Sequence, residues 1–170
     1  MSMIEAMVAA AVLGIGILGS FGGMVLASRQ NSSAARLGRA DGVATAIRSG
    51  LQVKSYAALS AATGPFDPGN CTLTPAVLAL TSGLSGLAPA CVVDLDAFDA
   101  AATPVNRIVP SYNPADGTTF RRVLVMWNNP AVGPTEIRTV AIIVSFADGL
   151  GRRSVQQFLG VYNPATNLLG

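Results

Sequence analysis

An uncharged apolar run near the N-terminus limits how this chain can fold more than any other feature. From Ala6 to Ser28 the sequence AMVAAAVLGIGILGSFGGMVLAS contains no charged residue over 23 positions. As an α-helix this run would be about 35 Å long, enough to cross the hydrocarbon core of a bilayer. A secretory signal peptide would begin with a basic segment, whereas the only charge before Arg29 is the acid Glu5. The run therefore predicts a membrane-spanning helix rather than a signal peptide.

Glycine is frequent inside this run. Each glycine costs about 1 kcal/mol relative to alanine in a water-exposed helix, but membrane helices tolerate glycine better. One pair has the GxxxG spacing, which suits close contact between helices. We expect these residues to soften the helix, so that it loosens where neighbouring helices pack closely. The glycines are Gly14, Gly16, Gly19, Gly22 and Gly23.

Glu5 lies at the edge of the uncharged run and needs a favourable partner. A carboxylate that leaves water loses several kcal/mol of hydration free energy. A paired cation or protonation of the carboxylate must offset that loss. The ordinary solution for a membrane helix is that the side chain reaches the lipid headgroups. The residue types alone leave headgroup contact and ion pairing both open.

The opening MSMIEAMVA, followed by AAVLGIGILG, resembles the mature N-terminus of type IV pilins and pseudopilins, whose fifth residue is glutamate. The stretch IEAMVAAAVLGIGILG is most similar to the PilV-type minor pilins. The resemblance implies that a peptidase has removed a leader and that Met1 is the N-methylated N-terminus of the mature chain. It further implies that Glu5 and Met1 of adjacent subunits form a charge pair during assembly. Pilins of the filament shaft commonly carry proline where this chain has Gly22, and threonine where it has Ser2, which favours a minor subunit.

A minor pilin helps to initiate assembly of a type IV pilus and forms part of the tip complex, and the resemblance implies this function here. The implied partners are other minor pilins, the major pilin and a tip adhesin, in a hetero-oligomer. Residues 1–28 would be the transmembrane and filament-core half of the N-terminal helix, and residues 29–170 a periplasmic globular domain. The chain would lie in the inner membrane before assembly and in the extracellular pilus afterwards. Two alternatives stay open: a minor pseudopilin of a type II secretion system, and a membrane-anchored periplasmic binding module.

The residue inventory argues against most enzyme chemistry. The sequence has no histidine and only two cysteines, so Ser-His-Asp triads, Cys-His dyads and the usual metal sets of His and Cys are excluded. The formal net charge is +2, which gives no strongly basic surface for nucleic acid. We therefore expect a protein that is not an enzyme, with no cofactor, no metal site and no nucleic-acid partner.

Two charged clusters offer weaker alternatives to that expectation. The carboxylates of Asp94, Asp96 and Asp99 are close in sequence and can supply oxygens to Ca²⁺, but the spaced loop and glycine of an EF-hand are missing. The pairs Arg121–Arg122 and Arg152–Arg153 can form a basic patch for DNA or an acidic partner. The favoured interpretation of both arginine pairs is a solvated surface at strand starts.

Cys71 and Cys91 are an even pair downstream of the apolar run. A disulfide between them would close a loop of about 20 residues and contribute about 3 kcal/mol in the chain-entropy model. Such a bond fits an oxidising compartment such as the periplasm. Two free buried cysteines are the alternative.

Beyond Arg29 the helical pattern becomes amphipathic, with apolar residues recurring every three, four or seven positions. This pattern predicts that the helix continues to Gly64-Pro65, giving one helix of about 60 residues. Residues 64–118 are rich in proline and predict loops, with one short helix after Thr74-Pro75. The expected apolar positions are Leu37, Ala40, Ala44, Ile47, Leu51 and Ala58.

Three segments rich in β-branched and aromatic residues follow, at 119–128, 136–146 and 153–161. Turn residues separate them, which predicts an antiparallel meander. Trp127, Phe146 and Phe158 are expected in the core of this sheet. The predicted fold class is α+β, with a long N-terminal helix packed on a small antiparallel sheet, as in the pilin fold.

Overall fold

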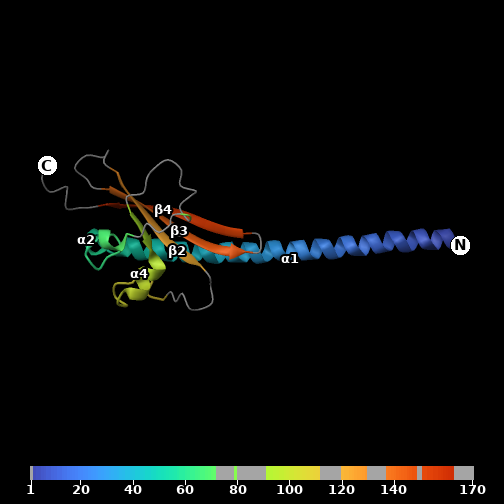
Figure 1. Ribbon diagram of the computed structural model, residues 1–170, viewed down its shortest axis with the longest axis horizontal. Helices are drawn as coiled ribbons and strands as arrows, with labels where there is room; N and C mark the ends of the chain where they lie inside the picture. The colour runs from blue at the N-terminus through green and yellow to red at the C-terminus, as the bar shows by residue number, and fades with distance from the viewer. Residues whose placement is uncertain are drawn as a thin grey trace. The chain divides into compact units, whose positions relative to one another are not determined.

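Helix α1 runs without interruption from Met3 to Val53, over 51 residues (Figure 1). The computed structural model describes residues 2–71, 79, 91–111, 120–129, 137–148 and 151–162. The chain divides into two units, Met1–Gly38 and Arg39–Gly170, by the contacts made within each. The predicted boundary after Ser28 marks the end of the membrane span, whereas the boundary after Gly38 reflects contacts within the chain. The predicted boundary therefore stays a prediction.

The predicted end of the long helix at Gly64-Pro65 is wrong, because the helix ends eleven residues before Gly64. α1 ends at Val53, and a separate helix, α2, spans Tyr56–Ser60. Between them Ser55 is extended, with φ −67° and ψ 154°, and its side chain accepts a hydrogen bond from the backbone N–H of Ala58. Serine at this position starts a new helix by satisfying one of its free N–H groups, which favours a break over continuation.

The buried residues of α1 follow the predicted stripe. Four of its side chains are buried, all in the second unit, and each lies three or four residues from the next. The stripe does not continue past the end of α1. In α2 Leu59 is buried, whereas Ala58, which was expected on the stripe, is exposed. The four buried residues of the stripe are Ala40, Ala44, Ile47 and Leu51.

The C-terminal end of α1 lies against the segment around Ile108. The Nζ of Lys54 donates to the backbone oxygens of Val105 and Asn106, both at 3.1 Å. At Gly50 a Cβ atom would overlap the carbonyl oxygen of Ile108. The close approach of these two backbones therefore requires glycine at position 50.

Gly50→Ala is expected to lower the free energy of unfolding by about 1–3 kcal/mol, because a backbone oxygen cannot move aside cheaply. Gly42→Ala is the matched control, since Gly42 lies in the same helix with nothing within 4 Å of its Cβ position. That control should stabilise the protein by about 0.5–1 kcal/mol through helix propensity. Denaturant titration of both variants checks the opposite signs, and equal effects would contradict the account.

Within the described residues the sheet has four antiparallel strands in the order β1-β2-β3-β4, and Figure 1 shows β2, β3 and β4 side by side. The three predicted strands are confirmed as an antiparallel meander of β2, β3 and β4. The sequence analysis missed β1 and the helix α4, which follows it directly. The bounds are β1 Cys91–Asp94, α4 Leu95–Ala101, β2 Arg121–Asn129, β3 Ile137–Asp148 and β4 Gly151–Tyr162, with a 3₁₀ turn, η1, at Pro68–Asn70. The predicted α+β class, a long N-terminal helix with an antiparallel sheet, is confirmed; the helix expected after Thr74-Pro75 lies outside the described residues.

The core predictions for the three aromatic residues are confirmed in two cases. Trp127 is 9% exposed and Phe146 is 2% exposed, and the ring of Phe146 meets Phe120 edge to face with centroids 5.8 Å apart. Phe158 is 55% exposed, so its prediction as a core residue is wrong. It lies on β4, the last strand of the described sheet, where it is opposite Ala141. Successive side chains of a strand point to opposite faces, and the neighbouring Gln157 bonds Asp41 and Thr45 of α1, so Phe158 points to the face away from that helix.

Candidate functional site

The first half of α1 presents an apolar surface that the rest of its own unit does not cover. In the described part of the chain α1 is the one helix long and apolar enough to cross a membrane, and its most apolar 18-residue window is 0% buried. Large apolar side chains from Met3 to Leu26 are exposed along this stretch. Exposed apolar area of this extent is covered by lipid or by other protein in a functional state. α1 is therefore a candidate membrane anchor.

Glu5 closes the N-terminus of α1 through a capping box. The backbone N–H of Ser2 donates to Glu5 Oε2 at 2.8 Å, and the N–H of Glu5 lies 3.4 Å from Ser2 Oγ. This reciprocal pair satisfies two N–H groups that have no partner within the helix. The sequence analysis missed this role, although the S-x-x-E spacing ahead of an apolar run is its signature. Met1 lies outside the described residues, so its pairing with Glu5 stays a prediction.

The glycines of the apolar run all lie within continuous α-helix. The backbone oxygen of Gly16 also accepts a hydrogen bond from Ser20 Oγ at 2.9 Å. A Cβ atom at any of the five glycines would meet nothing within 4 Å. These glycines therefore make no close contact in the described chain, and their predicted loosening between packed helices stays a prediction. The five are Gly14, Gly16, Gly19, Gly22 and Gly23.

The predicted disulfide between Cys71 and Cys91 is confirmed. Their Cα atoms are 5.2 Å apart, within the range that disulfides require, and the two residues are 20 positions apart in sequence. Cys71 directly follows η1, and Cys91 is the first residue of β1. The bond therefore ties the segment that follows α2 to the first strand of the sheet.

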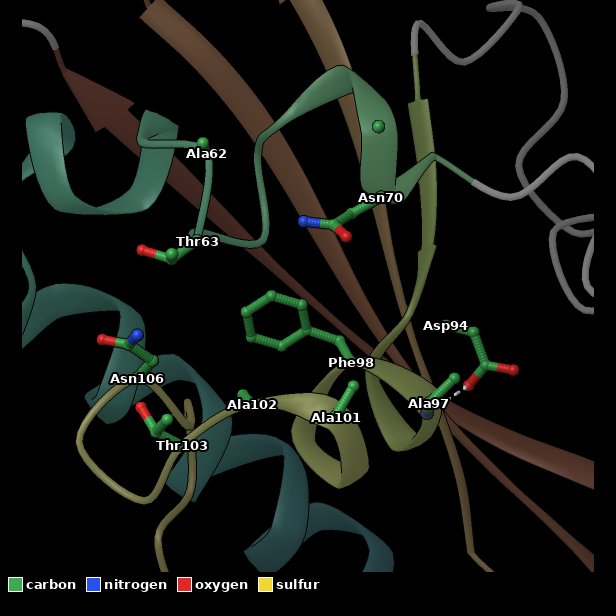
Figure 2. Close-up of a pocket in the computed structure, with 11 residues that line it drawn as sticks. Ala62, Thr63, Asn70, Asp94, Ala97, Phe98, Ala101, Ala102, Thr103 and Asn106 are labelled. Carbon is green, nitrogen blue, oxygen red and sulfur yellow. Dashed lines mark hydrogen bonds between the residues drawn. The ribbon is translucent and has the colours of Figure 1, made fainter.

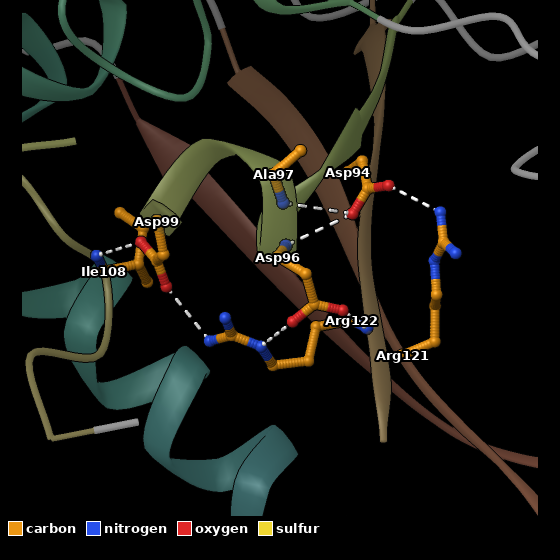
Figure 3. A network of polar contacts seen from close by, with 7 residues as sticks. All are labelled: Asp94, Asp96, Ala97, Asp99, Ile108, Arg121 and Arg122. Carbon is orange, nitrogen blue, oxygen red and sulfur yellow. Dashed lines mark hydrogen bonds and ion pairs between the residues drawn. The ribbon is translucent and has the colours of Figure 1, made fainter. Parts of the chain in front are cut away.

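The three aspartates considered as calcium ligands instead pair with arginines of β2 (Figure 3). Arg121 Nη2 lies 2.6 Å from Asp94 Oδ2, on the exposed side of the network. Arg122 Nε lies 2.7 Å from Asp96 Oδ1, and Arg122 Nη1 lies 3.0 Å from Asp99 Oδ2. We refer to these five residues as the acid-arginine network. In the part of the chain that the structure describes, no cluster of three His, Cys, Asp or Glu side chains suits a metal ion.

Arg122 corrects the prediction of a solvated arginine pair at the start of β2. Its side chain is 0% exposed, and Asp99 is 3% exposed. Arg121 is 45% exposed and fits the prediction better. Burial of a guanidinium requires nearby carboxylates, because an unpaired buried charge is strongly destabilising. The charges of Arg121 and Arg122 are therefore matched within the chain and form no open basic patch.

The second arginine pair, on β4, is also matched in part. Arg153 Nε lies 2.6 Å from Asp148 Oδ2. Arg152 Nη1 lies 3.5 Å from Ser145 Oγ and stays exposed. Both arginines are exposed, as the solvated-surface prediction expects, and with the charge of Arg153 paired they give only a small positive surface, much weaker than the patch that DNA requires.

The same carboxylates hold α4 in place. Asp94 Oδ1 accepts hydrogen bonds from the N–H groups of Asp96 and Ala97 and so caps α4. Asp99 Oδ1 accepts from the N–H of Ile108 at 3.0 Å. The three aspartates at the start of α4 and in its middle therefore connect β1, β2 and the segment that contacts the end of α1.

Comparisons of the chain with family models, with curated proteins and with solved structures found no match.

Proposed function

We propose that the chain is a minor pilin of a type IV pilus, which helps to initiate assembly and contributes to the tip complex. Its partners in this proposal are other minor pilins, the major pilin and a tip adhesin. The observation that carries the proposal is an acidic residue, Glu5, at the start of a long and unburied apolar helix. The resemblance of the first residues to pilins supports the same function.

Membrane anchoring alone does not require an acid at this position, since a capping box also forms with glutamine. A helix that only tethers a domain is served by apolar residues and by polar residues at the lipid headgroups. A filament core is different, because many helices pack together there and a carboxylate must find a cation. The capping bond to Ser2 uses Glu5 Oε2. Within the described residues Glu5 Oε1 accepts no hydrogen bond, which leaves it available for the N-terminal amine of a neighbouring subunit.

Two variants separate the charge of Glu5 from its capping role. Glu5→Ala removes both, whereas Glu5→Gln removes the charge and keeps a side-chain oxygen suited to a capping box. We expect both variants to reach the membrane and both to fall about tenfold or more in sheared, purified filaments, since a lone buried charge is costly to its partner. The measurement is the ratio of filament to membrane protein for each variant. Normal incorporation of Glu5→Gln would mean that capping suffices and that no charge pair forms.

A further inference from the structure

A pocket of about 410 Å³ lies in the second unit, between the segment around Thr63 and Asn70 and the segment from α4 to Asn106. Figure 2 shows the ring of Phe98 projecting between the two walls, with Thr63 and Asn70 on one side and Thr103 and Asn106 on the other. The volume is within the range of small-ligand sites. The acid-arginine network lies at one side of the pocket through Asp94.

The polar lining of the pocket is made of hydroxyl and carboxamide groups. In the described part of the chain the side chains of Thr63, Thr103 and Asn106 make no hydrogen bond. Asn70 Nδ2 donates to the carbonyl of Gly64 at 2.8 Å, which holds the amide in place and leaves its oxygen as an acceptor. Hydroxyl and carboxamide groups both donate and accept hydrogen bonds. Such a lining suits a ligand whose own groups do both.

The charge of the pocket excludes several ligand classes. Among the described residues that line it there is no lysine or arginine, and Arg121 beside it is already paired with Asp94, so a phosphate or carboxylate ligand would find no unpaired cation in this lining. The carboxylate in its described lining, that of Asp94, is bound to Arg121 at 2.6 Å and caps α4, so a cationic ligand would compete with an existing ion pair. The ring of Phe98 supplies an apolar surface beside the polar groups. The lining therefore suits a ligand that is neutral, rich in hydroxyl groups and partly apolar, as a sugar ring is.

We propose that this pocket binds a neutral saccharide residue, with a C–H face of the sugar against Phe98 and its hydroxyls on Thr63, Thr103 and Asn106. The inference goes beyond the proposed function and does not depend on it. The disulfide supports a preformed site, because Cys71 follows Asn70 in one wall and Cys91 opens the strand that leads to Asp94 in the other. Walls held in place before binding reduce the ordering cost of a small ligand.

The test is a titration of the full chain with galactose and with N-acetylglucosamine, followed by ligand-detected NMR. The chain is held in phosphatidylcholine nanodiscs, because a detergent with a sugar headgroup would compete. We expect saturable binding with a Kd on the order of millimolar, as for ligands of this size. Glucuronic acid is the charge control and should bind at least about tenfold more weakly, because no cation faces its carboxylate.

Thr63→Val and Phe98→Leu are the pocket variants, and each should weaken binding about fivefold. Thr63 is exposed, so its replacement by an isosteric residue leaves the fold intact even if Phe98→Leu does not. Thr139→Val is the matched control on β3, away from the pocket, and should bind as the unchanged protein does. The proposal is overturned if neither neutral sugar binds saturably, if glucuronic acid binds equally well, or if Thr63→Val and Thr139→Val behave alike.

Discussion

Arg122→Met is expected to lower the free energy of unfolding by about 3–5 kcal/mol, because it leaves the buried carboxylate of Asp99 without a cation. Methionine fills much of the same volume, so the effect reports the charge rather than a cavity. The single tryptophan, Trp127, lies in the sheet core at 9% exposure. Its fluorescence during denaturant titration therefore follows unfolding of the sheet without interference from the apolar half of α1.

Arg121→Met is the matched control for this prediction, since it changes the preceding residue of the same strand. The Arg121 side chain is 45% exposed, and its pair with Asp94 should contribute about 1 kcal/mol or less. A second variant, Arg122→Met with Asp99→Asn, should recover part of the loss, because the amide still accepts the bond from Ile108 N–H without carrying a charge. Equal stability of Arg121→Met and Arg122→Met would show that the acid-arginine network does not hold the domain together.

Removing the disulfide is the second change with a large expected effect. Replacing both Cys71 and Cys91 with serine should lower the free energy of unfolding by about 3 kcal/mol, the chain-entropy value for a loop of about 20 residues. The same fluorescence titration measures it. A thiol reductant should destabilise the unchanged protein by a similar amount and should leave the double serine variant unaffected. A reductant effect on both proteins, or on neither, would contradict a stabilising bond between these cysteines.

The elements that the sequence predicted well are those whose pattern is local and long. The stripe that contains Ile47 and Leu51 repeats over several helical turns, and each of the three long strands carries β-branched and aromatic residues between turn residues. The disulfide was predictable for a simpler reason, because two cysteines allow only one pairing within the chain. The helix end was misplaced because Ser55 is a common residue whose role as a cap depends on its conformation.

The acid-arginine network was beyond the sequence analysis. Its charges come from segments 23 to 27 positions apart, and no local pattern indicates which arginine meets which aspartate. β1 is only 4 residues long and α4 only 7, so each repeats its hydrophobic pattern about twice at most, too few times for the pattern to be recognised. Both elements depend on tertiary contacts, through Asp94 and Asp99, that exist only once the sheet has formed. Phe158 was misplaced for the related reason that tertiary packing, not composition, decides which face of a strand is covered.

Quantitative mass spectrometry of filaments sheared from the cells that naturally produce this chain tests the central claim most directly. A minor subunit of the tip must be present in those filaments and must be rare, because it does not stack on copies of itself along the shaft. The account predicts this chain at a few copies per filament, far below the most abundant pilin. Its absence from the filaments, or its presence as their most abundant subunit, would contradict the account.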